Sequence, residues 1–255
     1  MAQALSFTAV AGIPAVAPGD DLPALIAAAL AQSGSTLTEG DALVVAQKIV
    51  SKSEGRFIDL RTVTPSARAL ELAAITRKDA RLVELVLSES NEVLRAVPHV
   101  LIVRHRLGYV MANAGIDRSN VDSRDGAERA LLLPVDPDTS AARLRAGLRT
   151  LTGVAPGVIV SDSFGRPWRN GVINIALGAA GLPALIDRRG ETDLYGRRLE
   201  VTQVAWADGL AAGAALVMGE GAEGTPVALV RGARHDAPEV NAQALVRPIA
   251  EDLFR

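Results

Sequence analysis

Short apolar runs, separated by polar segments that contain glycine or proline, constrain the fold of this chain most. "LSFTAV" (5–10), "GVIVSD" (157–162) and "TPVALVRG" (225–232) have the length and composition of strands. Alanine-rich stretches, such as the one that starts near Leu22, have the length of helices. The two kinds of element do not alternate as strictly as in a βαβ protein. The pattern therefore predicts an α+β fold, with mixed sheets and flanking helices in two closely joined subdomains.

The remaining elements follow from periodicity and from turn residues. In the first half of the chain, we expect a strand over 41–56, two helices over 65–95 that are split near Lys78, and a hairpin over 99–115 that turns at 106–108. A short extended segment is expected over 130–138, followed by a helix over 139–152. We then expect a buried strand that runs into a polar loop over 156–171, and a short strand with a helix that ends near Met218. Asp20 and Asp21 are expected to cap the helix near Leu22. The whole of 1–255 is expected to form one domain, and the Pro- and Gly-rich segment 152–157 is the candidate joint between subdomains.

Composition excludes several classes of function. The chain has 255 residues and is 49% hydrophobic but only 3% aromatic, so Ala, Val, Leu and Ile must build its core. It has no cysteine, which excludes thiolate metal sites and cysteine nucleophiles. The formal net charge of −2 gives no basic excess for nucleic-acid binding. The N-terminus lacks the features of a signal peptide and no run is apolar enough to span a membrane, so we expect a cytoplasmic protein.

Three segments combine the end of an apolar element with a polar, glycine-containing loop, and functional groups often lie in such loops. They present Asp117, Asn120 and Asp122 in 108–122, Asp162, Ser163, Arg166, Arg169 and Asn170 in 158–171, and Glu220 and Glu223 in 217–224. These side chains offer oxygen atoms, which suit Mg²⁺ or Mn²⁺ better than zinc. The three histidines of the chain fit no metal-binding spacing.

Each of these residues also has a purely structural interpretation. Taken singly, an Asp or Asn in a loop is more often a turn former or a helix cap. In "QKIVSKSEGR" (47–56), Lys48 and Arg56 are expected at a solvated strand end, whereas Lys52 is the candidate for a phosphate contact. Trp168 and Trp206 are expected to be packing residues. The chain has neither a Walker motif nor a GxGxxG motif that opens a helix, and no histidine completes a nucleophilic triad.

With these residues in view, the chain resembles the coenzyme F420-0:L-glutamate ligases (F420-0:gamma-glutamyl ligases), in their single-domain form. The resemblance extends from about residue 12 to residue 232 and is carried by "GIPAVAPGDDL", "QKIVSKSEGR", "MANAGIDRSNV", "LLPVDPDTSAARLR", "SDSFGRPWRNG" and "VMGEGAEGTPVALVRG". It implies an enzyme that uses GTP and a divalent metal to join L-glutamate to F420-0 and then adds further glutamates through γ-linkages. It also implies two Mg²⁺ or Mn²⁺ sites, K⁺ as a further candidate cation, and a homodimer.

The resemblance assigns roles to individual residues. Asp117 and Asp162 would hold one metal ion, and Ser163 and Glu220 a second. The implied GTP contacts are Ile13, Pro14, Ala15, Val16, Gln47, Lys52, Asn120, Met218, Gly219, Glu220, Gly221, Ala222, Glu223, Gly224 and Thr225. Gln47 stands where relatives often carry a small hydroxyl residue. Arg166 and Arg169 are candidates for steadying phosphate or substrate carboxylates, from their charge and position alone.

The expected chemistry is the activation of a carboxylate by phosphoryl transfer from GTP, which gives an acyl phosphate that an amine can displace. Two other functions remain open at this point. The same acidic loops suit a metal-dependent nucleotide hydrolase or phosphatase, and a non-catalytic GTP-binding module is the third possibility. The substrates expected from the first hypothesis are F420-0, L-glutamate and GTP, with neither nucleic acid nor membrane as a partner.

Overall fold

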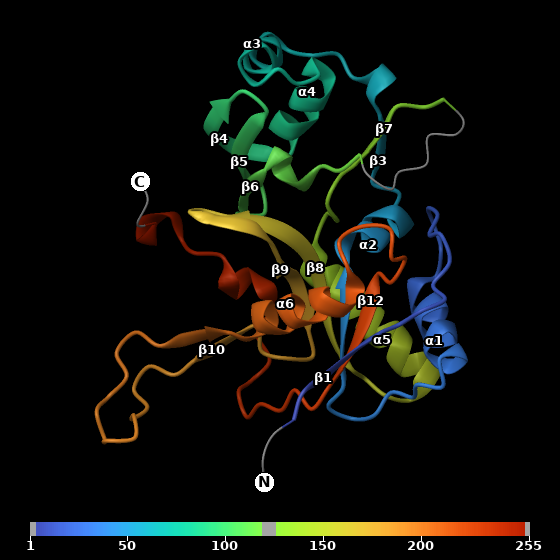
Figure 1. Ribbon diagram of the computed structural model, residues 1–255, viewed down its shortest axis with the longest axis vertical. Coiled ribbons are helices and arrows are strands. Elements are labelled where there is room, and N and C mark those ends of the chain that lie inside the picture. Colours follow the sequence, from blue (N-terminus) through green and yellow to red (C-terminus); the bar gives the residue numbers. More distant parts are fainter. Residues whose placement is uncertain (1–3, 119–125, 253–255) are drawn as a thin grey trace.

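The computed structural model describes residues 4–118 and 126–252 and confirms the expected α+β fold (Figure 1). Two of the residues singled out from the sequence, Asn120 and Asp122, lie outside the described residues. Within the described ranges, no helix is both long enough and apolar enough to cross a membrane.

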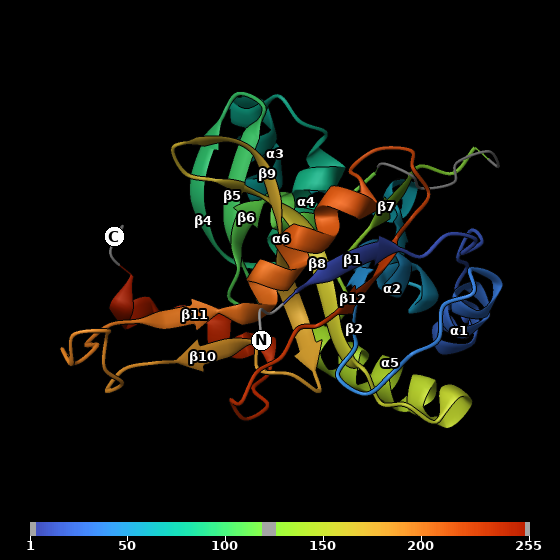
Figure 2. The same cartoon turned by 60° about the horizontal axis from the view of Figure 1, so that its bottom comes forward.

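A five-stranded sheet forms the centre of the molecule (Figures 1 and 2). Its strands lie in the order β1-β12-β2-β8-β9, with bounds β1 Ser6–Ala9, β2 Ala42–Ala46, β8 Gly157–Arg166, β9 Arg169–Ala180 and β12 Val227–Arg231. β2 and β8 are parallel, and the other neighbouring pairs are antiparallel. The carboxyl ends of β2 and β8 therefore meet at the same edge of the sheet.

Helices cover both faces of this sheet, which gives three layers (Figure 2). α1 (Leu22–Gln32) and α5 (Pro137–Thr152) pack on one face, where leucines and valines such as Leu144 and Val158 form the core. α6 (Trp206–Met218) packs on the other face, where alanines predominate. The core thus consists mainly of small and branched aliphatic side chains, as the composition predicts.

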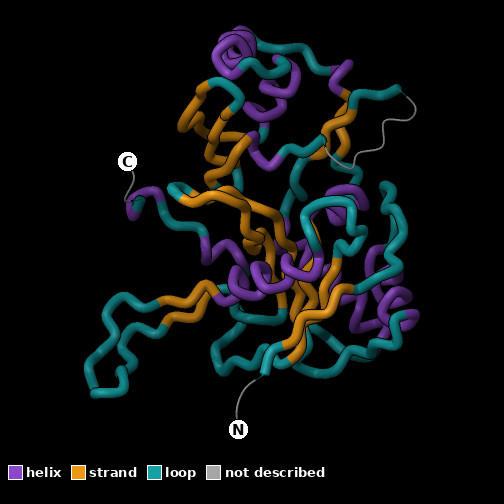
Figure 3. Tube along the Cα trace, viewed as in Figure 1, coloured by secondary structure: helices purple, strands orange, loops and turns teal. Residues whose placement is uncertain are grey.

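A smaller α+β unit follows α2 (Gln47–Ser53) in the chain and lies at the top of Figures 1 and 3. It contains the ribbon of β3 (Phe57–Asp59) and β7 (Arg129–Leu131), the three-stranded sheet of β4 (Ser90–Val97), β5 (Val100–His105) and β6 (Val110–Ala112), and the helices α3 (Ala67–Thr76) and α4 (Ala80–Ser88). The helices pack on these strands around a core of their own, which includes Leu72, Val83 and Val103.

A long hairpin extends from the body of the molecule (Figures 1 and 2). Its base is paired as β-sheet between β10 (Leu185–Asp187) and β11 (Gln203–Ala205), and an isolated antiparallel bridge joins Thr192 to Arg198 further along. After β12, the C-terminal segment contains two short 3-10 helices, Ala242–Leu245 and Ile249–Glu251.

Most of the expected elements are confirmed, including the hairpin near 106–108 and the cap of α1, where the Asp21 side chain accepts a hydrogen bond from the Ala24 backbone N–H at 3.1 Å. The expected strand over 41–56 is wrong beyond Ala46, because Gln47–Ser53 form the helix α2. Its β-branched residues favour a strand locally, but Ile49 and Val50 become buried on the helix and tertiary packing decides. The helical region expected up to residue 95 ends at Ser88, and the strand β4 begins at Ser90.

The polar loop expected over 163–171 is also wrong. β8 continues to Arg166, and β9 begins at Arg169 as its antiparallel partner, so the polar residues belong to a tight hairpin. Trp168 occupies the turn with a φ of 58° and is 84% exposed, so its expected packing role is wrong too. The alternation of apolar and polar residues was too irregular to indicate β9, which has a bulge next to Gly178.

Candidate active site

The pairing of β2 with β8 brings Gln47 and Asp162 together. Ala46, the last residue of β2, pairs with Ser161 of β8, so the residues that follow each of them lie at the same sheet edge. α2 begins directly at Gln47, without an intervening loop. Functional groups at the carboxyl ends of neighbouring parallel strands line a crevice in many α/β proteins.

Asp117 reaches this edge from the smaller unit. It follows a left-handed turn in which Asn113, Ala114 and Gly115 all have positive φ, and its backbone bonds in both directions with Leu131 of β7. Its Oδ2 lies 2.6 Å from Nζ of Lys48, the second residue of α2. The ion pair joins the smaller unit to the central sheet at the candidate site.

Asp162 is the most strongly perturbed acid at this edge. Burial of its carboxyl group, together with the nearby negative charge of Asp117, raises its pKa to about 7. The Ser163 backbone N–H, the charge of Lys48 and a hydrogen bond from the Gln47 side chain oppose this shift in part. A carboxyl group that is poised near neutral pH at a cavity is a feature of functional sites.

The side chain of Gln47 is itself held in place by a hydrogen bond within α2. It is only 3% exposed, and its Oε1 accepts a hydrogen bond of 2.9 Å from the buried Ser51 hydroxyl, one turn along α2. This leaves the amide nitrogen of Gln47 as the donor to Asp162. Gln47 was predicted to contact GTP, and the structure also gives it a contact with a predicted metal ligand.

The glycine-rich segment after α6 forms the opposite wall. The Thr225 hydroxyl donates to the Met218 carbonyl at 2.7 Å and so closes the loop between them. Inside the loop, the Gly221 backbone N–H donates to a carboxylate oxygen of Glu223 at 2.7 Å. A loop N–H that donates to a carboxylate oxygen in this way is suited to donate to a phosphate oxygen in its place.

These elements enclose a cavity of about 520 Å³, within the usual range for a small-molecule site. Its lining includes most of the residues predicted from the sequence: Ile13, Pro14, Ala15, Val16, Gln47, Lys52, Asp117, Asp162, Ser163, Met218, Gly219, Glu220, Gly221, Ala222, Glu223, Gly224 and Thr225. Arg166 and Arg169 are not among the lining residues and lie at the tip of the β8–β9 hairpin. Asn120 lies outside the described residues.

Three polar residues of the lining were not predicted as site residues. Lys48 was expected at a solvated strand end, but it lies on the helix α2 and lines the cavity beside Asp117. Ser161 and Asn174 are buried, and neither Ser161 Oγ nor Asn174 Oδ1 has a hydrogen-bond partner among the described residues. Asn174 pairs with Ser163 across β8 and β9, so recognising β9 as a strand would have indicated it.

The donor atoms of the cavity fit a hard divalent cation. Asp117 and Asp162 supply carboxylates, and the unpartnered oxygens of Ser161 and Asn174 are buried acceptors that a cation or its water ligands would satisfy. In the part of the chain that the structure describes, no three acidic or histidine side chains converge. Mg²⁺ does not require such a cage, because proteins commonly hold it through one or two carboxylates, waters and substrate phosphates.

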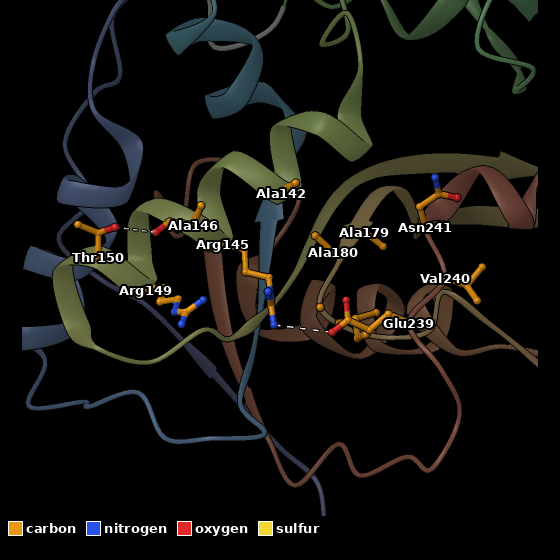
Figure 4. A pocket seen from close by; sticks show the side chains of 12 residues that line it. Ala142, Arg145, Ala146, Arg149, Thr150, Ala179, Ala180, Glu239, Val240 and Asn241 are labelled. Carbon is orange, nitrogen blue, oxygen red and sulfur yellow. Dashed lines mark hydrogen bonds and ion pairs between the residues drawn. The ribbon is translucent and has the colours of Figure 1, made fainter.

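A larger cavity of about 740 Å³ lies beside α5 and contains none of the predicted site residues (Figure 4). Figure 4 shows the Arg145 side chain reaching from α5 toward Glu239, with 3.7 Å between Nη2 and Oε1. Cavity volume alone therefore does not identify the candidate site. We choose the smaller cavity because acidic side chains, lysines and a glycine-rich loop converge on it.

The fold and this cavity define a class: an α+β protein whose cavity brings two carboxylates together with a glycine-rich loop, outside the P-loop and Rossmann groups. Comparison with known proteins gives the family. The sequence model of the F420-0:Gamma-glutamyl ligase family matches residues 12–232, and the chain belongs to that family.

Curated relatives agree over nearly the full length. The chain is 47% identical to the coenzyme F420:L-glutamate ligase of Methanothermobacter thermautotrophicus over 98% of this chain and 99% of that protein. It is 46% identical to the protein of the same name from Methanopyrus kandleri, over 94% and 93% of the two chains. The corresponding protein of Methanocaldococcus jannaschii is 43% identical, over 86% of each chain.

Proposed function

We propose that this protein is a GTP- and divalent-metal-dependent ligase, which adds L-glutamate to coenzyme F420-0 and then adds further glutamates through γ-linkages. It would act in the cytoplasm as a homodimer. The observation that carries the proposal is the convergence of Asp117, Asp162 and the loop Met218–Thr225 on one cavity. The names of the family and of its relatives support F420-0 and L-glutamate as substrates, and GTP comes from the sequence resemblance alone.

The first step of the proposed reaction is a phosphoryl transfer. A carboxylate oxygen of F420-0 attacks the γ-phosphorus of GTP, the bond to the β-phosphate oxygen breaks, and GDP leaves. The amine of glutamate then attacks the acyl carbon, phosphate leaves with its oxygen, and the nitrogen loses a proton to give the amide. Such transfers depend on positioning and charge neutralisation more than on acid–base groups.

The residues of the cavity suit these tasks. Backbone N–H groups of the glycine-rich loop, such as that of Gly221, bind phosphate oxygens, and Lys48 and Lys52 add positive charge on the facing wall. Asp117 and Asp162 would hold one cation, with Ser163 and Glu220 serving a second. Bound there, the cations would neutralise charge on the transferred phosphoryl group. We retain Arg166 and Arg169 only as candidates for contacts with a substrate that extends beyond the cavity.

The test uses the purified protein with F420-0, glutamate, GTP and Mn²⁺, with mass spectrometry to count added glutamyl units. Asp162→Asn preserves the size of the side chain but removes a charged ligand. We expect it to lower glutamate addition and coupled GDP release by at least about 100-fold, the scale found when a key electrostatic group is removed. Asp187→Asn, on the exposed hairpin, is the matched control and should retain normal activity.

Three results would contradict the proposal in different ways. Normal turnover in Asp162→Asn would remove Asp162 from the machinery. GTP hydrolysis without glutamate incorporation would favour a nucleotide hydrolase. Tight GTP binding without any turnover, with both other substrates supplied, would favour a non-catalytic GTP-binding module.

A further inference from the structure

We propose that a second cavity, at the edge of β9, binds the flat ring system of the acceptor substrate. The inference rests on the proposed function and assigns a subsite that the nucleotide cavity does not provide. The second cavity has a volume of about 260 Å³ and lies between β9, the turn that joins β5 to β6, and the C-terminal segment near Val246. This volume suits one ring system rather than a whole cofactor.

Its position relative to the candidate cation site is fixed by strand register. Ile175 lines the second cavity and pairs directly with Asp162 across β8 and β9. Such cross-strand pairs have Cβ atoms about 4.5–5.5 Å apart on one face of the sheet. Phe164, another wall residue, follows Asp162 by two positions and therefore shares its face. A ring in this cavity would therefore lie on the same face of the sheet as Asp162, beside the candidate cation site.

The walls are apolar and fixed in place. The rings of Tyr109 and Phe164 meet edge to face, with centroids 6.4 Å apart and an interplanar angle of 88°. The Tyr109 hydroxyl donates to the Leu177 carbonyl at 2.5 Å, which fixes the orientation of its ring. Ile175 and Val246 complete the apolar lining. Aromatic side chains with defined orientation are typical walls for a planar heterocycle.

Polar groups also line the cavity. Asp208 Oδ1 accepts the Ala176 backbone N–H at 2.9 Å, and its carboxyl group makes no second hydrogen bond to a residue that the structure describes. Burial raises the pKa of Asp208. Arg104, Arg247 and Asp252 also line the cavity, and Arg104 Nη2 lies 3.3 Å from Asp252 Oδ2, so this arginine is already paired. The acceptor of the proposed function is a deazaflavin, a flat tricycle whose pyrimidinedione end carries an N–H donor and carbonyl acceptors. Asp208 suits that donor.

The test separates ring binding from catalysis. The probe is 5-deazariboflavin, which carries the ring system but no carboxylate to activate, and its fluorescence reports binding. Val110→Trp fills the rim of the cavity from a position that is 46% exposed on β6. Val100→Trp is the control, because Val100 is 39% exposed on the adjacent β5 and does not line the cavity. Asp208→Asn is a second variant, which keeps an acceptor for Ala176 but turns an N–H donor toward the ring.

We expect Val110→Trp to weaken probe binding and raise the acceptor KM at least tenfold, with the GTP KM within twofold of normal. Asp208→Asn should weaken probe binding severalfold, and Val100→Trp should change neither value. Equal probe affinities and equal acceptor KM values in Val110→Trp and Val100→Trp would overturn the inference. If the unaltered protein binds the probe at this cavity but never adds glutamate, the proposed function fails while the ring site stands.

Discussion

Asp162 shows at the scale of a single residue how the fold creates reactivity. Its sequence context, "GVIVSD", predicts an acid at the end of a buried strand, but β8 continues to Arg166, so Asp162 lies inside the strand, just beyond the last pair of β2 with β8. The pKa of about 7 requires two further contributions, burial of the carboxyl group and the charge of Asp117, more than 40 residues away in the chain. No local pattern could predict that pairing, since it depends on how the smaller unit lies against the central sheet.

This raised pKa predicts a pH dependence of stability. An unfolded chain releases the Asp162 proton near its ordinary pKa of 3.8, whereas the folded protein holds it up to about pH 7. Between these values the folded state binds more protons, so the free energy of unfolding falls as pH rises through the window and levels off above about pH 7. The Asp162→Asn variant mimics the protonated form of Asp162, so its free energy of unfolding lacks this dependence on pH.

Thermal unfolding in EDTA, from pH 5 to pH 8, tests the prediction. We expect the melting temperature of the unaltered protein to fall by several degrees relative to Asp162→Asn between pH 5 and pH 7. Added Mn²⁺ should recover much of the loss at pH 8, because a cation stabilises the deprotonated carboxylate. Parallel curves for the two proteins would show that Asp162 titrates at its ordinary pKa.

At the scale of elements, the glycine-rich loop after α6 was predictable and the strand ends were not. The segment Met218–Thr225 was identified from its glycines and lies in the cavity as expected. Lys48 was misplaced because its β-branched neighbours favoured a strand, while burial of Ile49 and Val50 selected the helix α2. Asn174 was missed because β9 was not recognised. Propensity thus identified the polar loops, but long-range pairing determined which side chains face them.

The left-handed turn before Asp117 offers a test at this scale. At Gly115, with φ at +67°, an added Cβ would lie 2.6 Å from Met111 Cε and 2.9 Å from Leu133 Cδ1. Gly34 has nearly the same φ, +69°, but no atom within 4 Å of such a Cβ. Gly34→Ala therefore isolates the backbone cost, and Gly115→Ala adds steric overlap in the core.

Urea unfolding should separate the two costs. We expect Gly34→Ala to lower the free energy of unfolding by about 1 kcal/mol, the cost of a left-handed residue with a side chain. Gly115→Ala should lower it by roughly 2–4 kcal/mol, because overpacking adds about 1–3 kcal/mol. It should also raise the KM for Mn²⁺, since Asp117 follows two residues later. Equal losses in the two variants would mean that Met111 and Leu133 move aside without cost.

At the scale of the whole molecule, the three-layer body explains where polar chemistry can gather. Both faces of the central sheet are covered, by α1 and α5 on one side and α6 on the other, so the open edge at the ends of β2 and β8 is where ligands can approach. The α+β class followed from the sequence because it depends on the order of elements alone. The layering depends on which strands pair, and the sequence pattern left that open.

The hairpin that carries β10 and β11 supports the proposed homodimer. Its paired base is three residues long on each side, and its distal part exposes Leu194, Tyr195 and Val201 by 97%, 95% and 84%. A two-stranded hairpin without a packing partner is marginally stable in water, and exposed apolar groups of this kind mark interaction surfaces. We therefore expect the unaltered protein to sediment as a dimer and the double variant Leu194→Asp, Tyr195→Asp to sediment as a monomer. Asp substitution at Val172 and Leu151, which are 53% exposed outside this hairpin, gives a control with equal added charge. A dimer that persists in the hairpin variant at micromolar concentration would place the subunit contact elsewhere on the molecule.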